Sequence, residues 1–304
     1  MNAPLPVAIE PAPDPHLVDA VESSGGTVVT LDRARALVWH GPPHDFPNLP
    51  DAVEWVALPF AGIEAYYTSG AIDDRRLWTN ASGFYARGCA EHALALLLAG
   101  LRQINTSLML GWNTDVIPPA VRSLHDATVA IIGAGGIGRE LAPRLAACGA
   151  TVLAVNRSGT PIDGADRTVP STEIEDVLAA ADHVVLAAPS TAQTHHLIND
   201  RTLALLKPHS WIVNVARGEL IDQAALARAL RAGTIAGAAL DVTDPEPPSD
   251  DDPLWALPNV IITPHIANPT PGLTREMAPF LAENVRRFIA GDPLISVVDP
   301  ARGY

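Results

Sequence analysis

Residues 128–138 read TVAIIGAGGIG, an apolar, β-branched run that leads into a glycine-rich turn and then into a helical pattern. Such a turn binds the pyrophosphate of a dinucleotide when a strand precedes it and a helix follows it. The first glycine allows the tight turn, the second lets backbone N–H groups approach the phosphates, and the third lets helix pack on strand. The sequence therefore predicts a dinucleotide site. The residues expected to form it are Gly133, Gly135, Gly136, Ile137 and Gly138.

The residues after the next expected strand, at 151–155, indicate which dinucleotide is bound. An NAD-binding fold needs an acidic residue there to bridge the ribose hydroxyls, but this chain reads Asn156-Arg157-Ser158. Asn156 carries no charge, Arg157 offers a planar fork to a phosphate, and Ser158 adds a hydroxyl donor. We therefore expect NADP(H) to be preferred, with NAD(H) possible. The alternative for Arg157 is an exposed, solvated loop arginine.

Composition limits the class of protein. At 304 residues the chain is long enough for two domains, and 48% hydrophobic with 18% charged residues is typical of a globular enzyme. The formal net charge is −14, and Lys and Arg form no block anywhere. Nucleic acid and anionic membranes both demand a basic face, so neither is an expected partner.

Cysteine usage and apolar runs suggest a compartment. Cys89 and Cys148 form no disulfide framework, and we expect both to be buried thiols in a reducing compartment. The N-terminus does not read as a signal peptide, and the most apolar stretch, 93–101, is far shorter than the roughly 20 residues that span a bilayer. We expect a cytoplasmic protein. His195-His196 lacks Cys or carboxylate partners at ligand spacing, so no metal is expected.

Apolar patterning predicts two α/β units. In the first ninety residues, short apolar runs that favour strands fall at 6–9, 28–29, 36–39 and 53–58. From residue 128 the chain alternates strand and helix, with strands expected at 128–132, 151–155, 183–187, 211–215, 236–240 and 259–263. Six such strands with intervening helices fit a doubly wound parallel sheet.

Three helices connect or close these units. A long, largely buried helix is expected over 91–108. Another covers 222–232, with Asp222 as N-cap and Gly233 just past its end. The last, 275–290, is expected to cross back to the first unit and leave a cleft between two domains.

Polar residues follow three strands of the expected sheet. Strand 211–215 runs into Arg217, strand 236–240 into Asp241 and Glu246, and strand 259–263 into His265. Ligands of open parallel sheets bind beyond the carboxyl ends of the strands, so we expect these loops to share one crevice.

An arginine, a carboxylate and a histidine beside a nicotinamide suggest hydride transfer at a carbonyl next to a carboxylate. Arg217 would clamp the substrate carboxylate and polarise the carbonyl. His265 would protonate the carbonyl oxygen, and Glu246 would hold the imidazole in the right tautomer and keep it charged. Each residue alone has a structural interpretation, as a surface ion pair, a loop carboxylate or a core histidine. Their joint placement favours catalysis.

These segments together resemble the D-isomer-specific 2-hydroxyacid dehydrogenases, over nearly the whole chain. The residues that carry the resemblance are GAGGIG at 133–138, VNVARG at 213–218, the loop 241–247 and Thr263-Pro264-His265. It implies a Rossmann domain at 92–270 inserted into a smaller, flavodoxin-like α/β substrate domain made of 1–91 and 271–304. It also implies a homodimer paired through the nucleotide domain.

The resemblance implies further site residues. Arg217, Glu246 and His265 match the catalytic trio, Asp241 would contact the nicotinamide carboxamide, and the loop 59–63 would offer N–H groups to the substrate carboxylate. Further cofactor contacts implied are Pro189, Ser190, Thr194, Val215, Ala216, Arg217 and His265. Substrate contacts expected are Trp39, Ala61, Gly62, Ile63, Arg217 and His265.

Within the family, the chain looks most like the NADPH-preferring glyoxylate/hydroxypyruvate reductase A branch. The residues behind this are Trp39-His40, Pro42-Pro43, Asn156-Arg157-Ser158 and the terminal VDPARGY at 298–304. We therefore expect NADPH-dependent reduction of small 2-oxo acids such as glyoxylate and hydroxypyruvate. The loop Phe60-Ala61-Gly62-Ile63-Glu64 matches the family only loosely, and residues 84–98 look as much like phosphoglycerate dehydrogenases. A D-3-phosphoglycerate or other D-2-hydroxyacid dehydrogenase is the alternative, and a nucleotide-sensing, corepressor-like binding protein is the rival from another class.

Overall fold

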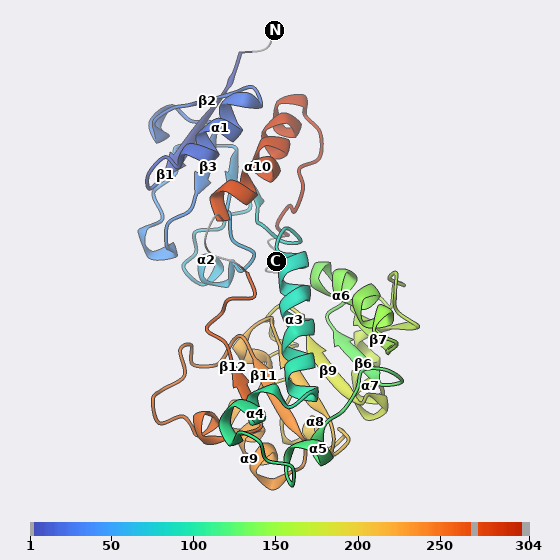
Figure 1. The fold of residues 1–304 in the computed structure, drawn as a ribbon. Helices are drawn as coiled ribbons and strands as arrows, with labels where there is room; N and C mark the ends of the chain where they lie inside the picture. Colours follow the sequence, from blue (N-terminus) through green and yellow to red (C-terminus); the bar gives the residue numbers. More distant parts are fainter. Residues whose placement is uncertain (1–2, 269–272, 300–304) are drawn as a thin grey trace. The chain divides into compact units, whose positions relative to one another are not determined.

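The computed structural model describes residues 3–268 and 273–299. The chain divides into two compact units, one formed by Met1–Tyr85 with Pro269–Tyr304 and the other by Ala86–Asn268 (Figure 1). The first division lies at the start of a long helix, whereas the expected boundary after residue 91 lies inside that helix. The second expected boundary, after residue 270, lies outside the described residues, as do positions 300–304 of the terminal motif.

The larger unit is built on a seven-stranded, fully parallel sheet with the order β12-β11-β10-β9-β6-β7-β8. Its strands are β6 (Thr128–Ile132), β7 (Thr151–Asn156), β8 (Arg167–Pro170), β9 (His183–Leu186), β10 (Trp211–Asn214), β11 (Gly237–Leu240) and β12 (Val260–Ile262). The chain winds outward from β6 in both directions, which confirms the predicted doubly wound fold. All six expected strands are present. The seventh, β8, gave no signal because its sequence RTVP is short, half polar and ends in proline.

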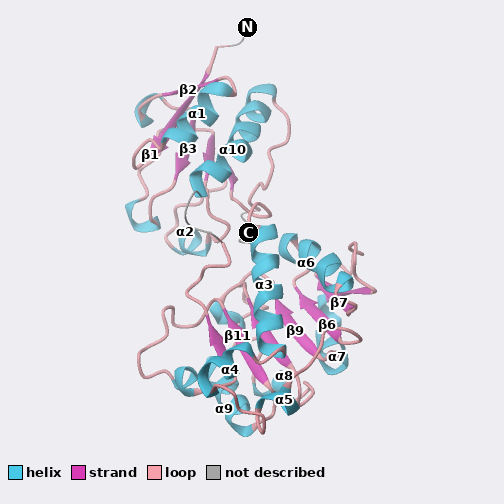
Figure 2. Cartoon of the chain, in the orientation of Figure 1, coloured by secondary structure: helices cyan, strands magenta, loops and turns pink. Residues whose placement is uncertain are grey.

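Helices cover both faces of this sheet, as Figure 2 shows. They are α3 (Ala86–Leu101), α4 (Ile104–Leu110), α5 (Ile117–Ala120), α6 (Gly136–Ala147), α7 (Ile174–Ala180), α8 (Asp200–Leu203) and α9 (Gln223–Ala232). The caps of α9 are those the sequence predicted. The Asp222 carboxylate accepts a hydrogen bond from the Ala225 N–H, and Gly233 ends the helix with a φ of 69°.

The helix expected over 91–108 is wrong as a single element. Gln103 takes a left-handed conformation, with φ 54°, and separates α3 from α4. Its side chain donates to the Gly100 carbonyl and accepts from Thr106, so local hydrogen bonds stabilise the break. In the described part of the chain, no single helix is long and apolar enough to cross a membrane. Only α3 and α4 taken together, with a 51° bend between them, meet that length and composition.

The smaller unit has its own parallel sheet, with the order β2-β1-β3-β4-β5. Its strands are β1 (Leu5–Glu10), β2 (Gly26–Val28), β3 (Ala36–Trp39), β4 (Trp55–Ala57) and β5 (Leu77–Thr79). This strand order is the flavodoxin-like one, as the resemblance implied. The unit also contains α1 (Pro15–Ser23), the short α2 (Glu64–Thr68) and α10 (Leu273–Ala290). The strand β5, with the sequence LWT, was not among the expected strands.

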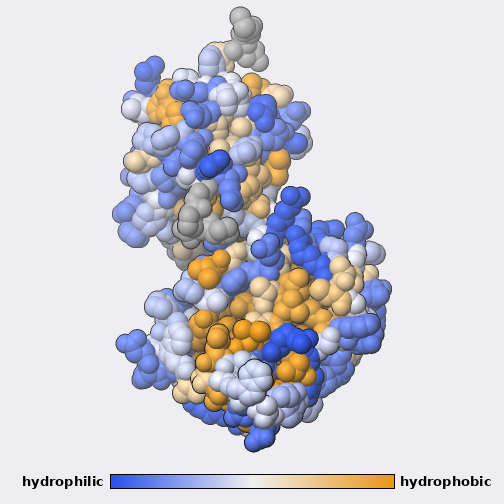
Figure 3. Space-filling view, viewed as in Figure 1, coloured by the Kyte–Doolittle hydropathy of each residue, from blue (hydrophilic) through white to orange (hydrophobic). Residues whose placement is uncertain are grey.

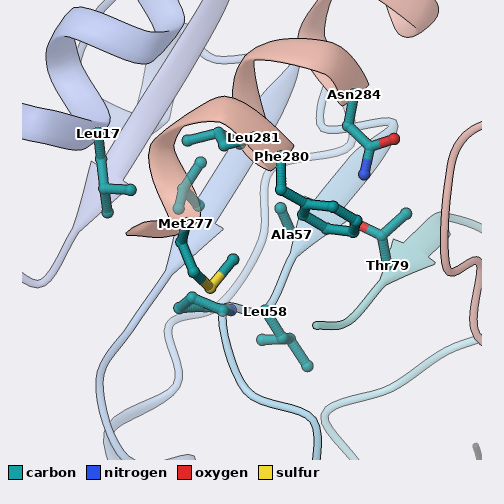
Figure 4. A pocket seen from close by; sticks show the side chains of 10 residues that line it. Leu17, Ala57, Leu58, Thr79, Met277, Phe280, Leu281 and Asn284 are labelled. Carbon is teal, nitrogen blue, oxygen red and sulfur yellow. The ribbon is translucent and has the colours of Figure 1, made fainter. Parts of the chain in front are cut away.

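The last helix, α10, returns to the first unit as predicted. Leu281 and Val285 are buried in the same core cluster as Val7 and Trp55, so α10 completes a core that begins at the N-terminus. Figure 4 shows α10 side chains, including Met277, closing over a cavity beside the sheet. That cavity measures only about 10 Å³, room for at most one water, so it is packing space and not a substrate site.

The two cysteines do not share one environment. Cys89 is buried, as expected, but Cys148 is exposed, so the prediction of two buried thiols is wrong for Cys148. The reason is positional: Cys148 is the C-cap of α6 and lies beyond the last buried residue of its apolar face, Leu145.

Candidate active site

The glycine-rich turn joins β6 to α6 and is shaped for a phosphate group. Gly133 has a φ of +99°, and a Cβ there would lie 2.4 Å from the backbone nitrogen of Ala188, so only glycine fits. Gly135 is the N-cap of α6 and makes no side-chain cap, which leaves the first N–H groups of the helix for another acceptor. A Cβ on Gly135 would meet no atom of the described residues within 4 Å. This cradle at a helix N-terminus fits the pyrophosphate of a dinucleotide.

Asn156 folds the loop after β7 into a tight turn around Arg157. Its Oδ1 accepts from the N–H groups of Ser158 and Thr160, both at 3.1 Å, and its Nδ2 donates to the Thr160 carbonyl at 2.7 Å. The Ser158 and Thr160 hydroxyls lie 2.6 Å apart, and Arg157 is exposed. Asn156 therefore organises the loop, and Thr160 joins Ser158 as a second hydroxyl. Sequence reasoning missed Thr160, although an Asn followed by Ser-Gly-Thr is an Asx-turn signal.

The loop after β9 contains Pro189, Ser190 and Thr194, three of the residues expected to contact the cofactor. The Thr194 hydroxyl donates to the Pro189 carbonyl at 2.7 Å, and it accepts from the Thr191 N–H at 2.8 Å. Thr194 thus braces the loop from within, while Pro189 is exposed and Ser190 half-buried.

Asn214, the last residue of β10, sets the turn that presents Arg217. Its side chain is fully buried, accepts from the Ala216 N–H at 3.0 Å and donates to the Arg217 carbonyl at 2.8 Å. The Arg217 guanidinium donates to the Ala216 carbonyl at 2.6 Å. Val215 and Ala216 are buried beside it. Asn214 was missed because a lone Asn within a strand pattern carries no site signal by itself.

The structure brings Glu246 and His265 together. The Nδ1 atom of His265 lies 2.6 Å from Oε1 of Glu246, and both side chains are nearly half exposed. A carboxylate only accepts hydrogen bonds, so the proton between these atoms belongs to Nδ1. This leaves Nε2 of His265 as the nitrogen that can exchange a proton with a bound molecule.

Asp241, directly after β11, holds three successive N–H groups of the His265 loop. Its backbone carbonyl accepts from His265, its Oδ1 from Ile266 and its Oδ2 from Ala267, each at 2.9 Å. These bonds hold His265 at a φ of +51°, a conformation that costs a non-glycine residue about 1–3 kcal/mol. The Asp241 carboxylate is therefore buried and engaged in shaping the loop, a role that sequence reasoning did not assign to it.

The three strands that end at these residues are neighbours. β10, β11 and β12 are adjacent and parallel, so Arg217, Glu246 and His265 follow them at the same edge of the sheet. Burial, the largest effect, raises the pKa of Cys89 to about 11, with Asp241 and Arg217 acting on it electrostatically. A thiol with this pKa is poorly reactive at neutral pH. Cys89 lies near the start of α3, so the charges of Asp241 and Arg217 reach that part of the helix.

The substrate positions expected in the first unit lie at the carboxyl edge of its own sheet. Trp39 ends β3, is 3% exposed and packs edge-on against Phe46. The loop 59–63 follows β4, and within it Ala61 is exposed and Gly62 half-buried, whereas the Ile63 side chain belongs to the core. Asn80 fixes this loop because its Nδ2 donates to the Ala61 carbonyl at 3.0 Å.

The histidine pair His195-His196 has no metal-binding geometry. Their rings stack with centroids 4.0 Å apart. Across residues 3–268 and 273–299, no three His, Cys, Asp or Glu side chains gather in a way that could hold a metal ion.

Comparison with known proteins agrees with this architecture. Residues 94–267 match the family model described as the NAD-binding domain of D-isomer-specific 2-hydroxyacid dehydrogenases. An uncharacterized protein of Corynebacterium melassecola is 40% identical over 301 residues, which cover 95% of this chain and 98% of that protein. A D-3-phosphoglycerate dehydrogenase of Mycobacterium leprae is 38% identical over 78% of this chain, but the match spans only 45% of that longer protein.

Two solved structures share the whole fold. A D-isomer-specific 2-hydroxyacid dehydrogenase of Xanthobacter autotrophicus, in complex with NADPH and MES, superposes over 100% of both chains with a TM-score of 0.86 and 29% identity. An NADPH-dependent glyoxylate/hydroxypyruvate reductase of Sinorhizobium meliloti, in complex with NADP and sulfate, covers 99% of this chain and 100% of its own, with a TM-score of 0.84 and 26% identity. The chain, an oxidoreductase with a nicotinamide-binding domain, belongs to the D-isomer-specific 2-hydroxyacid dehydrogenase family.

Proposed function

We propose that this protein reduces small 2-oxo acids, glyoxylate and hydroxypyruvate above all, to D-2-hydroxy acids with NADPH as the preferred cofactor. The observation that carries the proposal is the 2.6 Å contact between Glu246 and His265, at the sheet edge where Arg217 also lies. A guanidinium and a carboxylate-supported imidazole are the groups that reduction of a 2-oxo acid requires.

Each group has a distinct task in the proposed reaction. A nicotinamide bound at this site would supply the hydride for the carbonyl carbon. Arg217 binds the substrate carboxylate and polarises the carbonyl oxygen. His265 donates its Nε2 proton to that oxygen, while Glu246 stabilises the imidazolium through Nδ1 before the proton leaves. In the oxidative direction, the neutral imidazole removes the hydroxyl proton.

In the first unit, the loop positions Ala61, which is exposed, and Gly62, which is half-buried, are proposed to bind the substrate carboxylate through backbone N–H groups. Trp39 and Ile63 are proposed to shape the loop. Of the four expected substrate contacts in this unit, Ala61 and Gly62 are accessible, whereas Trp39 and Ile63 are almost fully buried. We therefore assign contact with the substrate to the backbone of this loop and a supporting role to the two buried side chains.

Two observations support NADPH over NADH. The first residues after β7, 157–160, include no acid and present Arg157 with the hydroxyls of Ser158 and Thr160, a set of donors suited to a 2′-phosphate. The two superposed dehydrogenases were solved with NADPH and with NADP. Asp241, Pro189 and Ser190 are proposed to contact the nicotinamide half of the cofactor.

The test is steady-state kinetics with NADPH and NADH against a panel of 2-oxo acids, followed at the nicotinamide absorbance. We expect the highest kcat/KM for glyoxylate or hydroxypyruvate with NADPH. We also expect His265→Gln to lower kcat about 10²–10⁴-fold. Tight NADPH binding without turnover of any 2-oxo or 2-hydroxy acid would instead identify a nucleotide-sensing binding protein.

A second candidate substrate is D-3-phosphoglycerate, favoured by the 38% identity to the mycobacterial enzyme. It is oxidised in the reverse direction by the same residues. The two candidates separate in one assay, because a phosphoglycerate dehydrogenase would turn over 3-phosphoglycerate with NAD⁺ faster than it reduces glyoxylate with NADPH.

We also propose that the protein is a homodimer paired through α4 and the segment after it. Exposed apolar side chains gather there, in the region around α4 where Figure 3 shows hydrophobic atoms at the surface. Leu108 is 84% exposed and Trp112 97% exposed, values unusual for large apolar residues in a monomer. A groove of about 480 Å³, lined in part by Leu110, Val116 and Trp211, adjoins this surface. A second copy would bury both features.

Sedimentation of Leu108→Glu tests the dimer. We expect the wild type to sediment as a dimer and the variant as a monomer, because a buried, unpaired carboxylate opposes association. Leu77→Glu, at an exposed leucine of the first unit, is the matched control and should remain dimeric. A monomeric wild type would refute the proposal.

A further inference from the structure

A histidine on α3 contacts the machinery that shapes the His265 loop. The Nε2 atom of His92 lies 3.1 Å from the Thr263 hydroxyl and 3.2 Å from Oδ1 of Asp241. The Thr263 hydroxyl is itself 2.6 Å from the same Oδ1. His92 is separated from Asp241 by more than half of the unit's sequence, and it belongs to an element that carries none of the proposed catalytic residues.

The protons in this triangle can be assigned. The Asp241 carboxylate has none to give, and the single hydroxyl proton of Thr263 is used in its short bond to Asp241. Nε2 of His92 must therefore carry a proton and donate it toward Thr263 and Asp241. A residue at position 92 must therefore donate a hydrogen bond here, because an acceptor would find no proton on Thr263 or Asp241.

The same carboxylate holds the His265 loop. Oδ1 of Asp241 also accepts from the Ile266 N–H, and Oδ2 from the Ala267 N–H. The Asp241 side chain is 1% exposed, so water does not replace a lost donor easily. A hydrogen bond from His92 that holds the Asp241 carboxylate in place therefore also holds the left-handed backbone of His265 in place.

We infer that His92 is a positioning residue: acting through Thr263 and Asp241, it holds His265 in the orientation that proton transfer requires. The inference rests on the proposed role of His265 as the acid. A shift of about 1 Å in a reacting group can cost about 10²-fold in rate, so loss of this one donor is expected to be measurable in kcat.

The primary test compares three variants of the full-length protein. His92→Leu removes the donor and keeps an apolar volume, whereas His92→Gln keeps an N–H at a similar reach. His125→Leu removes an exposed histidine elsewhere in the same unit and serves as the control. We expect kcat to fall about 10- to 100-fold in His92→Leu, to stay within about threefold in His92→Gln, and to be unchanged in the control. The Kd for NADPH should be unchanged in the control and should change less than kcat in His92→Leu.

A double-mutant cycle shows whether His92 acts through His265. In a His265→Gln background, His92→Leu should cause no further loss of kcat, because there is no acid left to position. Thr263→Val breaks the same triangle without touching α3, so it should reproduce the His92→Leu loss even if that variant folds poorly. Its loss should not add to that of His92→Leu.

The outcomes separate this inference from the function on which it rests. A His265→Gln enzyme as active as the wild type would refute the proposed acid role itself. If His265→Gln is impaired, the positioning role of His92 is overturned by any of three results. These are unchanged kcat in both His92→Leu and Thr263→Val, an equal loss in His92→Gln, or a full additional loss from His92→Leu in the His265→Gln background.

Discussion

His183, at the start of β9, makes the stability of the larger unit sensitive to acid. It lies at the opposite end of the strands from Arg217 and His265, is 2% exposed, and its Nδ1 accepts the Trp211 N–H at 3.3 Å. Burial is the main reason that its pKa is lowered from 6.5 to about 4. Asp182 opposes this lowering, and the electrostatic effects of His209, Lys207 and Arg122 add to it. The imidazole is therefore neutral in the folded state. We predict that replacing it with Asn removes a specific pH dependence of folding.

The magnitude follows from proton linkage. Above pH 6.5 His183 is neutral in both the folded and the unfolded chain, so it contributes no pH dependence. As the pH falls below 6.5, the unfolded chain takes up a proton that the folded protein refuses until about pH 4, and the free energy of unfolding decreases. At about 1.4 kcal/mol per pH unit, this window corresponds to a loss of about 3 kcal/mol.

The assay is urea unfolding, followed by circular dichroism, at a series of pH values from about 7.5 to about 4.5. Within this range Asp182 contributes little pH dependence, because its ordinary pKa of 3.8 and its folded-state pKa of about 2 both lie below it. Burial opposes this lowering, and hydrogen bonds from Lys207, Thr128 and His209 produce it. In His183→Asn, Oδ1 replaces Nδ1 as the acceptor for Trp211, and the cost of the missing ring is the same at every pH. The wild-type stability should therefore fall by between about 2 and 3 kcal/mol more than that of the variant across pH 6.5 to 4.5. Parallel curves for the two proteins would refute the reasoning.

The other predictions concern the cofactor loop, the glycine turn and the thiols. Arg157→Ala should raise the Kd for NADPH at least about tenfold more than that for NADH, whereas Arg167→Ala, whose guanidinium pairs with a glutamate, should change neither; equal losses for both cofactors would exclude a 2′-phosphate contact. Gly133→Ala should abolish nicotinamide binding or folding, because its Cβ would strike backbone atoms at a φ of +99°, and wild-type NADPH binding by this variant would contradict the turn geometry. A thiol reagent should label Cys148 rapidly in the native protein and Cys89, whose pKa is raised to about 11 by burial, only after unfolding; labelling of two thiols in the native state would show that the Cys89 environment opens.

The sequence by itself determined the elements whose signals are local. The TVAIIGAGGIG run, the capping of α9 by Asp222 and the six strands of the larger sheet were predicted because periodicity, caps and glycine positions act within a few residues. The candidate residues Arg217, Glu246 and His265 could also be named, since the ends of parallel strands meet at one edge. Signals failed for β5 and for the short, half-polar β8, and where a side chain broke a helix, as Gln103 does.

Only the tertiary structure decided how these residues are held. The loop around His265 depends on Asp241, about two dozen positions earlier in the chain, and on His92, which belongs to another element altogether. Local sequence patterns do not predict such contacts. A donor and an acceptor far apart in sequence meet only after the strands are aligned and α3 has packed on the sheet. The residue types of the candidate site could thus be named from the sequence. Its geometry came from buried hydrogen bonds that exist only in the folded protein.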